Sequence, residues 1–418
     1  MAATPPTQLL NRNFLLLWQG QAVSQLGNQA FAIAMVFWAK EATGSASLMG
    51  ALLAASALPS FLLAPLGGAL ADRAPRLKIA LFCDLASGAL LALLAALFWF
   101  GGLRPLLALC LAATALLLGT LVAFLTPALT SALPDLVPKE RLPAANALNQ
   151  LAIQTSVFAG QGLGGVLFTA LGAPLLFALD AFSFFLAAGS TALAVAPPPP
   201  QKAPLAAGAA FRTLAADLAQ GFAYARQTPG LLGFVLAAAA FNFFSMPLLV
   251  LLPFYVEHML GKGAAWYGFL MAAISLGAVV GYVAVGALPL AGRARSRFLV
   301  ALMLAAPLGL AALGVIRSPR PALAAAFSLG LLSGAIGVYV LTALQATTPP
   351  ELRGRMMGLF SALTGGAGPL GLALGGVVGD LLDKNIPLIA TGAAALALLA
   401  ALTAVSQRST REFLAYEG

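Results

Sequence analysis

The chain has 418 residues, of which 61% are hydrophobic and only 8% are charged, and its formal net charge is +9. Soluble domains carry about 25% charged residues, so this composition excludes a water-soluble fold and indicates a polytopic membrane protein. The 22 basic residues are spread over the whole length and form no basic domain. The positive-inside rule explains them better than a nucleic-acid partner does.

Twelve apolar segments are long enough for membrane-spanning helices, which need about 20 residues each. They lie near 13–38, 46–71, 77–100, 104–131, 144–171 and 173–195, and then near 230–256, 265–290, 296–316, 321–346, 354–382 and 386–405. Between these sets stands a run of four prolines, Pro197 to Pro200, which no helix can cross. The sequence therefore predicts a six-helix bundle at 1–195, a cytoplasmic Pro-rich linker with an amphipathic helix at 196–229, and a six-helix bundle with a short cytoplasmic tail at 230–418.

The distribution of basic residues supports this count. With both termini in the cytoplasm, sixteen of the 22 basic residues fall in cytoplasmic segments, as the positive-inside rule requires. Similar turns at Pro138 to Arg141 and at Pro350 to Arg353 stand about half a chain apart, each followed at the same distance by a Gly-Gly pair. Two halves in parallel repeat predict a substrate site near the middle of the membrane, at their interface.

The first dense group of charges follows the second apolar segment, in residues 67–78 (Gly-Gly-Ala-Leu-Ala-Asp-Arg-Ala-Pro-Arg-Leu-Lys). A short charged connection between two spans is typical of a helical hairpin at a membrane surface. Such a turn explains the basic residues. It does not explain the carboxylate of Asp72 at a Gly-rich helix end.

With these features in place, the chain resembles the major facilitator superfamily. The run from Gly68 to Lys78 is similar to the superfamily's loop 2–3 motif, with Pro75 in place of the usual glycine. The stretches Gln19 to Gly27 and Leu133 to Asn149 resemble the bacterial branch that contains macrolide-efflux and enterobactin-exporter-like proteins. The resemblance implies an all-α membrane protein with twelve transmembrane helices in two pseudo-symmetric six-helix bundles, located in the bacterial cytoplasmic (inner) membrane.

The resemblance also gives the charged turn a role, as a conformational latch against the cytoplasmic start of the eleventh span. The candidate latch residues are Gly68, Asp72, Arg73, Arg76 and Lys78. A helix N-terminus favours a carboxylate by roughly 0.3–1 kcal/mol. The alternative is a turn that only sets the topology.

Polar amides recur inside the predicted spans. Gln21, Gln25 and Asn28 lie at i, i+4 and i+7, on one face of the first span. Because lipid offers no hydrogen-bond partners, such amides must face protein or water. We expect a substrate cavity lined by Gln21, Gln25, Asn28, Gln150, Gln154 and Gln161 and completed by Asn242 of the seventh span. The alternative is hydrogen bonding between helices that only holds the bundle together.

Acids inside the spans are candidates for proton coupling by default. Asp180 lies in the sixth span, and Asp84 lies in the third, near the basic turn. Asp84 has an alternative interpretation as a structural partner of that turn. The branch commonly has Gly-Asp where this chain has Gly27-Asn28, and Asn28 cannot carry a proton.

These features predict a secondary active transporter that exports a hydrophobic or amphipathic small molecule, of the drug or siderophore type, by alternating access with proton antiport. The alternatives are a lipid or lysolipid transporter of the same fold and a receptor that does not transport. No Walker-type sequence, Cys/His cluster or nucleophile–base pair occurs, so we expect no enzyme, cofactor or metal. The expected partners are the substrate, protons and membrane lipid, with the chain as a monomer.

Overall fold

The computed structural model describes residues 9–101, 106–195, 207–287 and 292–415, and within these ranges every regular element is helical. The first half contains α1 (Arg12–Thr43), α2 (Ala46–Ala71), α3 (Arg76–Phe100), α4 (Leu107–Leu136), the 3-10 turn η2 (Lys139–Arg141) and α5 (Leu142–Leu193). The helix α6 (Ala207–Gln227) follows. The second half contains α7 (Leu231–Phe254), the π-helical turn η3 (Tyr255–Met259), α8 (Ala264–Ala287), α9 (Gly292–Val315), α10 (Pro319–Thr347), α11 (Pro350–Leu381), α12 (Ile386–Ser406) and α13 (Arg408–Leu414).

The helix α5 is two helices joined at a break. Gly172 has φ 71° and ψ 172°, a conformation that is open to glycine but strained for other residues. Pro174 follows two residues later and lacks the backbone N–H that would bridge the break. The two arms of α5 therefore correspond to the fifth and sixth spans that the sequence predicts on either side of residue 172.

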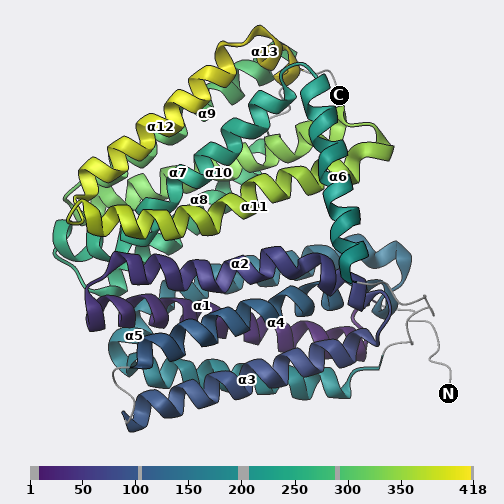
Figure 1. Cartoon of the computed structure of the whole chain (residues 1–418), viewed down its shortest axis with the longest axis vertical. Coiled ribbons are helices and arrows are strands. Elements are labelled where there is room, and N and C mark those ends of the chain that lie inside the picture. Colours follow the sequence, from purple (N-terminus) through teal and green to yellow (C-terminus); the bar gives the residue numbers. More distant parts are fainter. Residues whose placement is uncertain (1–8, 102–105, 196–206, 288–291, 416–418) are drawn as a thin grey trace. The chain divides into compact units, whose positions relative to one another are not determined.

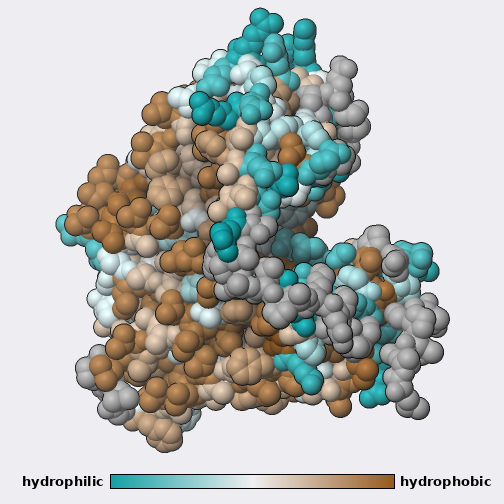
Figure 2. Space-filling model, turned by 45° about the vertical axis from the view of Figure 1, so that its right-hand side comes forward, coloured by the Kyte–Doolittle hydropathy of each residue, from teal (hydrophilic) through white to brown (hydrophobic). Residues whose placement is uncertain are grey.

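Ten helices within the described ranges are long and apolar enough to cross a membrane, and the two-armed Ala144–Leu193 counts as one of them. The helix α1 is not among the ten, although its 32 residues are ample for a span. Its glutamines and asparagine lower its hydropathy, as expected of a helix that faces a polar space rather than lipid. Much of the face seen in Figure 2 is hydrophobic. Large apolar side chains such as Phe82, Trp99 and Phe100 are more than 60% exposed. The chain is therefore an integral membrane protein.

The chain divides into two compact units. Unit 1 comprises Met1–Ala42 and Ala55–Arg212, and unit 2 comprises Thr43–Ala54 and Thr213–Gly418. The first turns of α2 thus belong to unit 2, while the rest of that helix belongs to unit 1. The domain boundaries predicted from the sequence at 195 and 230 remain a prediction.

The helices of unit 2 pack against one another as one bundle (Figure 1). The helix α7 lies beside α11 and α12, α10 lies beside α8 and α9, and α9 also lies beside α12. Small residues allow the closest approach, between α8 and α10: a Cβ added to Gly277 would lie 2.0 Å from the carbonyl oxygen of Phe327. Close packing on glycine is the usual way in which membrane helices associate.

The amphipathic linker helix predicted from the sequence is α6. Asp217 of this helix forms an ion pair with Arg355 at the start of α11, with 3.1 Å between the carboxylate oxygen and Nε. The hydroxyl of Tyr224 donates a hydrogen bond to the carbonyl oxygen of Thr347 at the end of α10. These contacts attach α6 to one end of unit 2. The four-proline run at 197–200 lies outside the described residues.

Candidate functional site

Unit 1 encloses a cavity of about 490 Å³ between α1, α4 and α5. Its lining residues are Phe14, Leu17, Trp18, Gln21, Ser24, Gln25, Asn28, Gln29, Val122, Leu125, Thr126, Leu129, Thr130, Leu133, Asn146, Asn149, Gln150 and Ile153. Seven of these side chains are carboxamides, which offer both donors and acceptors without a charge. We call this space the amide cavity. Its volume lies within the range of about 300–1,000 Å³ that is usual for small-molecule sites.

The helix α1 supplies the amides because its polar residues share one face. Gln21, Gln25 and Asn28 all line the amide cavity, as their spacing in the sequence predicted. The indole N–H of Trp18 donates a hydrogen bond of 3.1 Å to the carbonyl oxygen of Leu148. This bond fixes one wall of the cavity, because it joins α1 to the first arm of α5.

The amides of α5 separate into two groups. Gln150 lines the amide cavity, whereas Gln154 and Gln161 are not among its lining residues. The side chain of Gln161 donates a hydrogen bond of 3.0 Å to Oε1 of Gln29 on α1. For Gln161 the geometry therefore matches the alternative interpretation of an interhelical hydrogen bond. Asn146, which the sequence places one turn before Gln150, lines the cavity as well. Asn149 also lines it, and its signal in the sequence is the spacing of three residues from Asn146.

Asn242 lines a second cavity, which lies entirely within unit 2. Its neighbours there are almost all apolar. The predicted role of Asn242 in completing the amide cavity therefore remains a prediction.

Asp84 is fully buried in α3, and Oδ2 accepts a hydrogen bond of 3.0 Å from the side-chain amide of Gln21. Its other oxygen, Oδ1, has no hydrogen-bond partner within the described part of the chain. The contact links the acid directly to a residue that lines the amide cavity. The partner found is thus an amide of α1, and not the basic turn of the alternative interpretation.

Asp180 is also fully buried, in the second arm of α5. Its Oδ1 accepts a hydrogen bond of 3.1 Å from the hydroxyl of Ser183, and its Oδ2 has no hydrogen-bond partner among the described residues. Gly27 of α1 packs against this group, since a Cβ added there would lie 2.2 Å from Oδ1 of Asp180. The glycine next to Asn28 therefore makes room for a carboxylate from another helix.

The charged turn is tied down within unit 1. Arg76 forms an ion pair with Asp135 of α4 and donates from Nε to the carbonyl oxygen of Ala71 at 3.2 Å. Arg73 donates to the carbonyl oxygen of Ala69 at 2.8 Å. The pairing with Asp135 was not predicted from the sequence, because the two residues belong to different helices and lie 59 positions apart.

Two further predicted latch residues, Gly68 and Lys78, contribute little packing. A Cβ added to Gly68 meets nothing within 4 Å, whereas one added to Gly67 would lie 2.0 Å from the carbonyl oxygen of Ala123 on α4. Gly67 is therefore the glycine that brings α2 close to α4. Lys78 is exposed.

A contact that the sequence did not single out joins the start of α2 to the end of α11, within unit 2. Asp380 accepts hydrogen bonds from the Ser45 hydroxyl at 2.8 Å and from the backbone N–H groups of Ala46 and Ser47 at 2.9 and 2.8 Å. Lys384 lies 3.0 Å from the same carboxylate. A helix N-terminus leaves its first N–H groups without partners, and Asp380 satisfies two of those of α2. The signal in the sequence was the Ser-Ala-Ser start of α2, which no local acid caps.

The helical fold, the apolar surface and the amide-lined cavity define a membrane transporter with the major facilitator fold. Solved structures agree on the fold: a peptide transporter POT has a TM-score of 0.74 at 15% identity, covering 98% of this chain and 97% of that chain. A bacterial homologue of the iron transporter ferroportin has a TM-score of 0.70 at 17% identity, covering 96% and 100%.

The family model described as "Transmembrane secretion effector" matches residues 3–415, so the chain belongs to this family of the major facilitator superfamily. Macrolide efflux protein A of Streptococcus pyogenes is 25% identical over 382 residues, which are 89% of this chain and 90% of the relative. Enterobactin exporter EntS of Shigella boydii serotype 18 is 31% identical over 272 residues, 63% of this chain and 61% of the relative.

Proposed function

We propose that this protein exports a hydrophobic or amphipathic small molecule from a bacterial cell across the cytoplasmic membrane and that the amide cavity holds the polar part of that molecule. The observation that carries this proposal is the clustering of seven carboxamides around one enclosed space in unit 1. Carboxamides bind hydroxyl, carbonyl and amide groups of either hydrogen-bond polarity. The efflux relatives support the direction of transport.

The composition of the cavity favours a substrate with mixed chemistry. Phe14, Leu17 and Leu133 line the same space as the amides, so one molecule can place apolar surface and hydrogen-bonding groups side by side. None of the lining residues carries a formal charge. A substrate whose polar groups are neutral fits this lining best, because the amides satisfy hydrogen bonds but supply no counter-ion.

Proton antiport is proposed to run through Asp84. Gln21 donates from its side-chain nitrogen to Asp84 and also lines the amide cavity. The ionised acid therefore holds this amide in one orientation, and protonation of the acid weakens that hold. A substrate that binds Gln21 in this orientation favours the ionised acid, so that substrate binding and proton binding exclude one another, as antiport requires.

Alternating access is proposed to use different contacts at the two ends of α11. At its end, Asp380 holds the first turn of α2 in the arrangement described above. At its start, the predicted latch would bring Asp72 to the region of Gly354 to Gly358. Asp380 lies at the N-terminus of α2, and the latch would place Asp72 at the N-terminus of α11. A helix N-terminus is a favourable place for negative charge.

Lipid or lysolipid transport remains the second candidate function. The hydrophobic lining residues would accept part of an acyl chain, and the amides a headgroup. The seven carboxamides of the amide cavity favour a molecule with several hydrogen-bonding groups over a lipid with a long acyl chain.

The test is transport by the purified protein in proteoliposomes with an imposed pH gradient. A panel of macrolides, catecholate siderophores and lysolipids is first screened by thermal stabilisation, and the compounds that stabilise the protein are then assayed for flux. We expect gradient-dependent flux of a neutral amphipathic compound. Flux that does not depend on the pH gradient would contradict proton antiport. Flux of lysolipids alone would favour lipid transport over the export of a drug-like molecule.

A further inference from the structure

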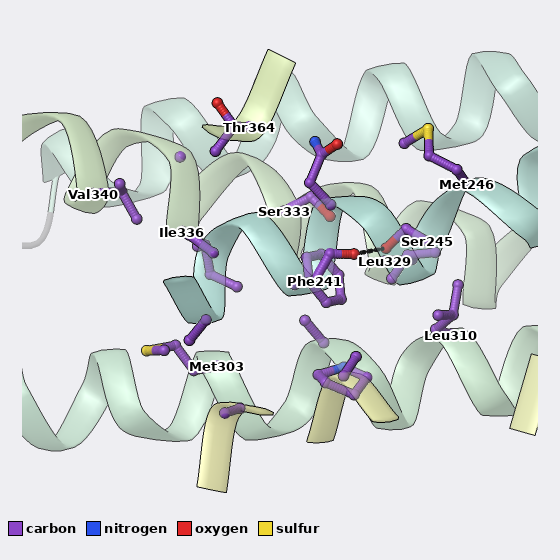
Figure 3. A pocket seen from close by; sticks show the side chains of 18 of the residues that line it. Phe241, Ser245, Met246, Met303, Leu310, Leu329, Ser333, Ile336, Val340 and Thr364 are labelled. Carbon is purple, nitrogen blue, oxygen red and sulfur yellow. Dashed lines mark hydrogen bonds between the residues drawn. The ribbon is translucent and has the colours of Figure 1, made fainter. Parts of the chain in front are cut away.

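Unit 2 contains a cavity of about 440 Å³ that the proposed function does not use. Figure 3 shows side chains of its lining from close by. The lining residues come from all six helices α7 to α12. We call this space the apolar cavity.

The lining carries no charge and few polar groups. Aromatic and thioether side chains, including Phe241, Phe360, Met246 and Met303, surround the space. Methionine is flexible and polarisable and makes favourable contacts with aromatic rings. A lining of this kind adapts to flat, apolar ring systems.

Two of the four polar lining residues are engaged with their own helices. The Ser245 hydroxyl donates to the carbonyl oxygen of Phe241 at 2.6 Å, drawn as a dashed line in Figure 3. The Thr364 hydroxyl donates to the carbonyl oxygen of Phe360 at 2.7 Å. Their donors are therefore used, and only acceptor capacity remains.

The other two polar residues, Asn242 and Ser333, retain their hydrogen-bonding capacity. Neither forms a hydrogen bond with another residue in the described part of the chain. The half-buried amide of Asn242 therefore offers its donors and its acceptor to the cavity. Asn242 is thus a neutral anchor in surroundings that are otherwise apolar.

The size of the cavity limits the occupant. A protein cavity of about 150 Å³ holds one benzene molecule, so this space corresponds to roughly three rings. The cavity is therefore large enough for a molecule of about three rings.

We propose that the apolar cavity is a binding site for an uncharged, predominantly apolar molecule of about three-ring size whose single hydrogen-bonding group meets Asn242 or Ser333. The proposal is independent of transport, because the site lies within unit 2 and shares no residue with the amide cavity. It would hold for a protein that bound such a molecule without exporting it.

The probe is 1-aminoanthracene, an uncharged three-ring fluorophore with one amino group, and anthracene is its partner without the hydrogen-bonding group. Saturable binding to the full-length protein in lipid nanodiscs is measured by fluorescence, with empty nanodiscs as the background. The azido derivative of the probe is then photolysed, and the labelled peptides are identified by mass spectrometry. We expect one saturable site and labels on α7, α9 or α10.

A matched pair of glycine variants tests the location. Gly337 of α10 lines the apolar cavity, and a Cβ added to it meets nothing within 4 Å, so Gly337→Leu fills the space without a clash. Gly392 of α12 also has open space at its Cβ but does not line the cavity. We expect Gly337→Leu to raise the dissociation constant at least tenfold and Gly392→Leu to leave it unchanged.

The anchor is tested with Asn242→Ala. This variant should weaken binding of 1-aminoanthracene about fivefold and leave anthracene binding unchanged. Binding that survives Gly337→Leu, or labels confined to unit 1, would overturn the proposal. Failure of export with intact probe binding would count against the proposed function alone.

Discussion

The two cavities have similar volumes and opposite chemistry. The amide cavity of unit 1 measures about 490 Å³ and has seven carboxamides in its wall, while the apolar cavity of unit 2 measures about 440 Å³ and has one. The amide cavity lies between α1, α4 and α5, whereas all of the helices α7 to α12 line the apolar cavity. The two halves of the chain therefore differ both in the helices that form a cavity and in the side chains that line it.

The carboxylates of the two units differ in the partners that surround them. Unit 1 holds Asp84 and Asp180, each fully buried with one oxygen lacking a hydrogen-bond partner within the described residues. In unit 2, Asp380 receives three hydrogen bonds and an ion pair from Lys384. The carboxylate of Asp380 is thus held by the start of α2 and by Lys384, whereas Asp84 and Asp180 each accept from a single neighbouring side chain.

The largest expected effect is the loss of proton coupling in unit 1. Asp84→Asn should reduce gradient-driven export to the level measured without a gradient and should leave substrate exchange at equal pH intact, because an amide cannot release a proton. The measurement is flux in proteoliposomes under both conditions.

Asp180→Asn is the matched control for that variant. Its only described hydrogen-bonding partner is Ser183 in the same helix, and the isosteric amide preserves the space beside Gly27. We expect this variant to remain coupled to the gradient. The reverse result, coupling lost only at Asp180, would transfer the role to that residue.

The second effect concerns the contact at the end of α11. Asp380→Asn exchanges charge-assisted hydrogen bonds for neutral ones, a loss of about 1.5 kcal/mol or roughly tenfold in the opening equilibrium. Amide hydrogen exchange of the peptide that contains Ala46 and Ser47 should become about tenfold faster.

Asp383→Asn serves as the control for Asp380→Asn. This exposed residue has a positive φ of 48°, which asparagine tolerates well. Equal exchange rates in the two variants would show that Asp380 does not hold the start of α2.

The third prediction compares two glutamines of α5, one inside the lining of the amide cavity and one outside it. Gln150→Leu should weaken substrate binding about fivefold, the usual net value of one hydrogen bond, whereas Gln154→Leu, one turn further along the same helix, should change it less than twofold. Thermal-shift titration of each purified variant measures both. Equal effects of the two substitutions would show that Gln154 also contributes to substrate binding.

The smallest effect belongs to the charged turn. Asp72→Asn should slow transport two- to fivefold and leave substrate affinity unchanged, in line with about 0.3–1 kcal/mol for a carboxylate at a helix N-terminus. Lys78→Gln, at an exposed position of the same turn, provides the control. Unaltered transport in the Asp72 variant would reduce the turn to a topology signal.

Much of the fold could be predicted from the sequence because it depends on local properties. Hydropathy located the helices. The break at Gly172 lies between the spans predicted at 144–171 and 173–195, which together are too long for one membrane crossing. The helical period placed Gln21, Gln25 and Asn28 on one face, and all three line one cavity. The packing of the charged turn was harder to predict, because Gly67, and not the latch candidate Gly68, makes the close contact with α4.

The sequence by itself therefore determined the helical membrane fold, the family and the polar face of α1, since apolar length and a repeat of 3.6 residues are properties of single segments. Only the tertiary structure decided which partners the polar groups have. The pairs Asp84–Gln21, Arg76–Asp135 and Asp380–Ser45 each join segments far apart in the chain, and so does the apolar cavity around Asn242. Such contacts depend on how helices pack against one another, and no local pattern of residues encodes that packing.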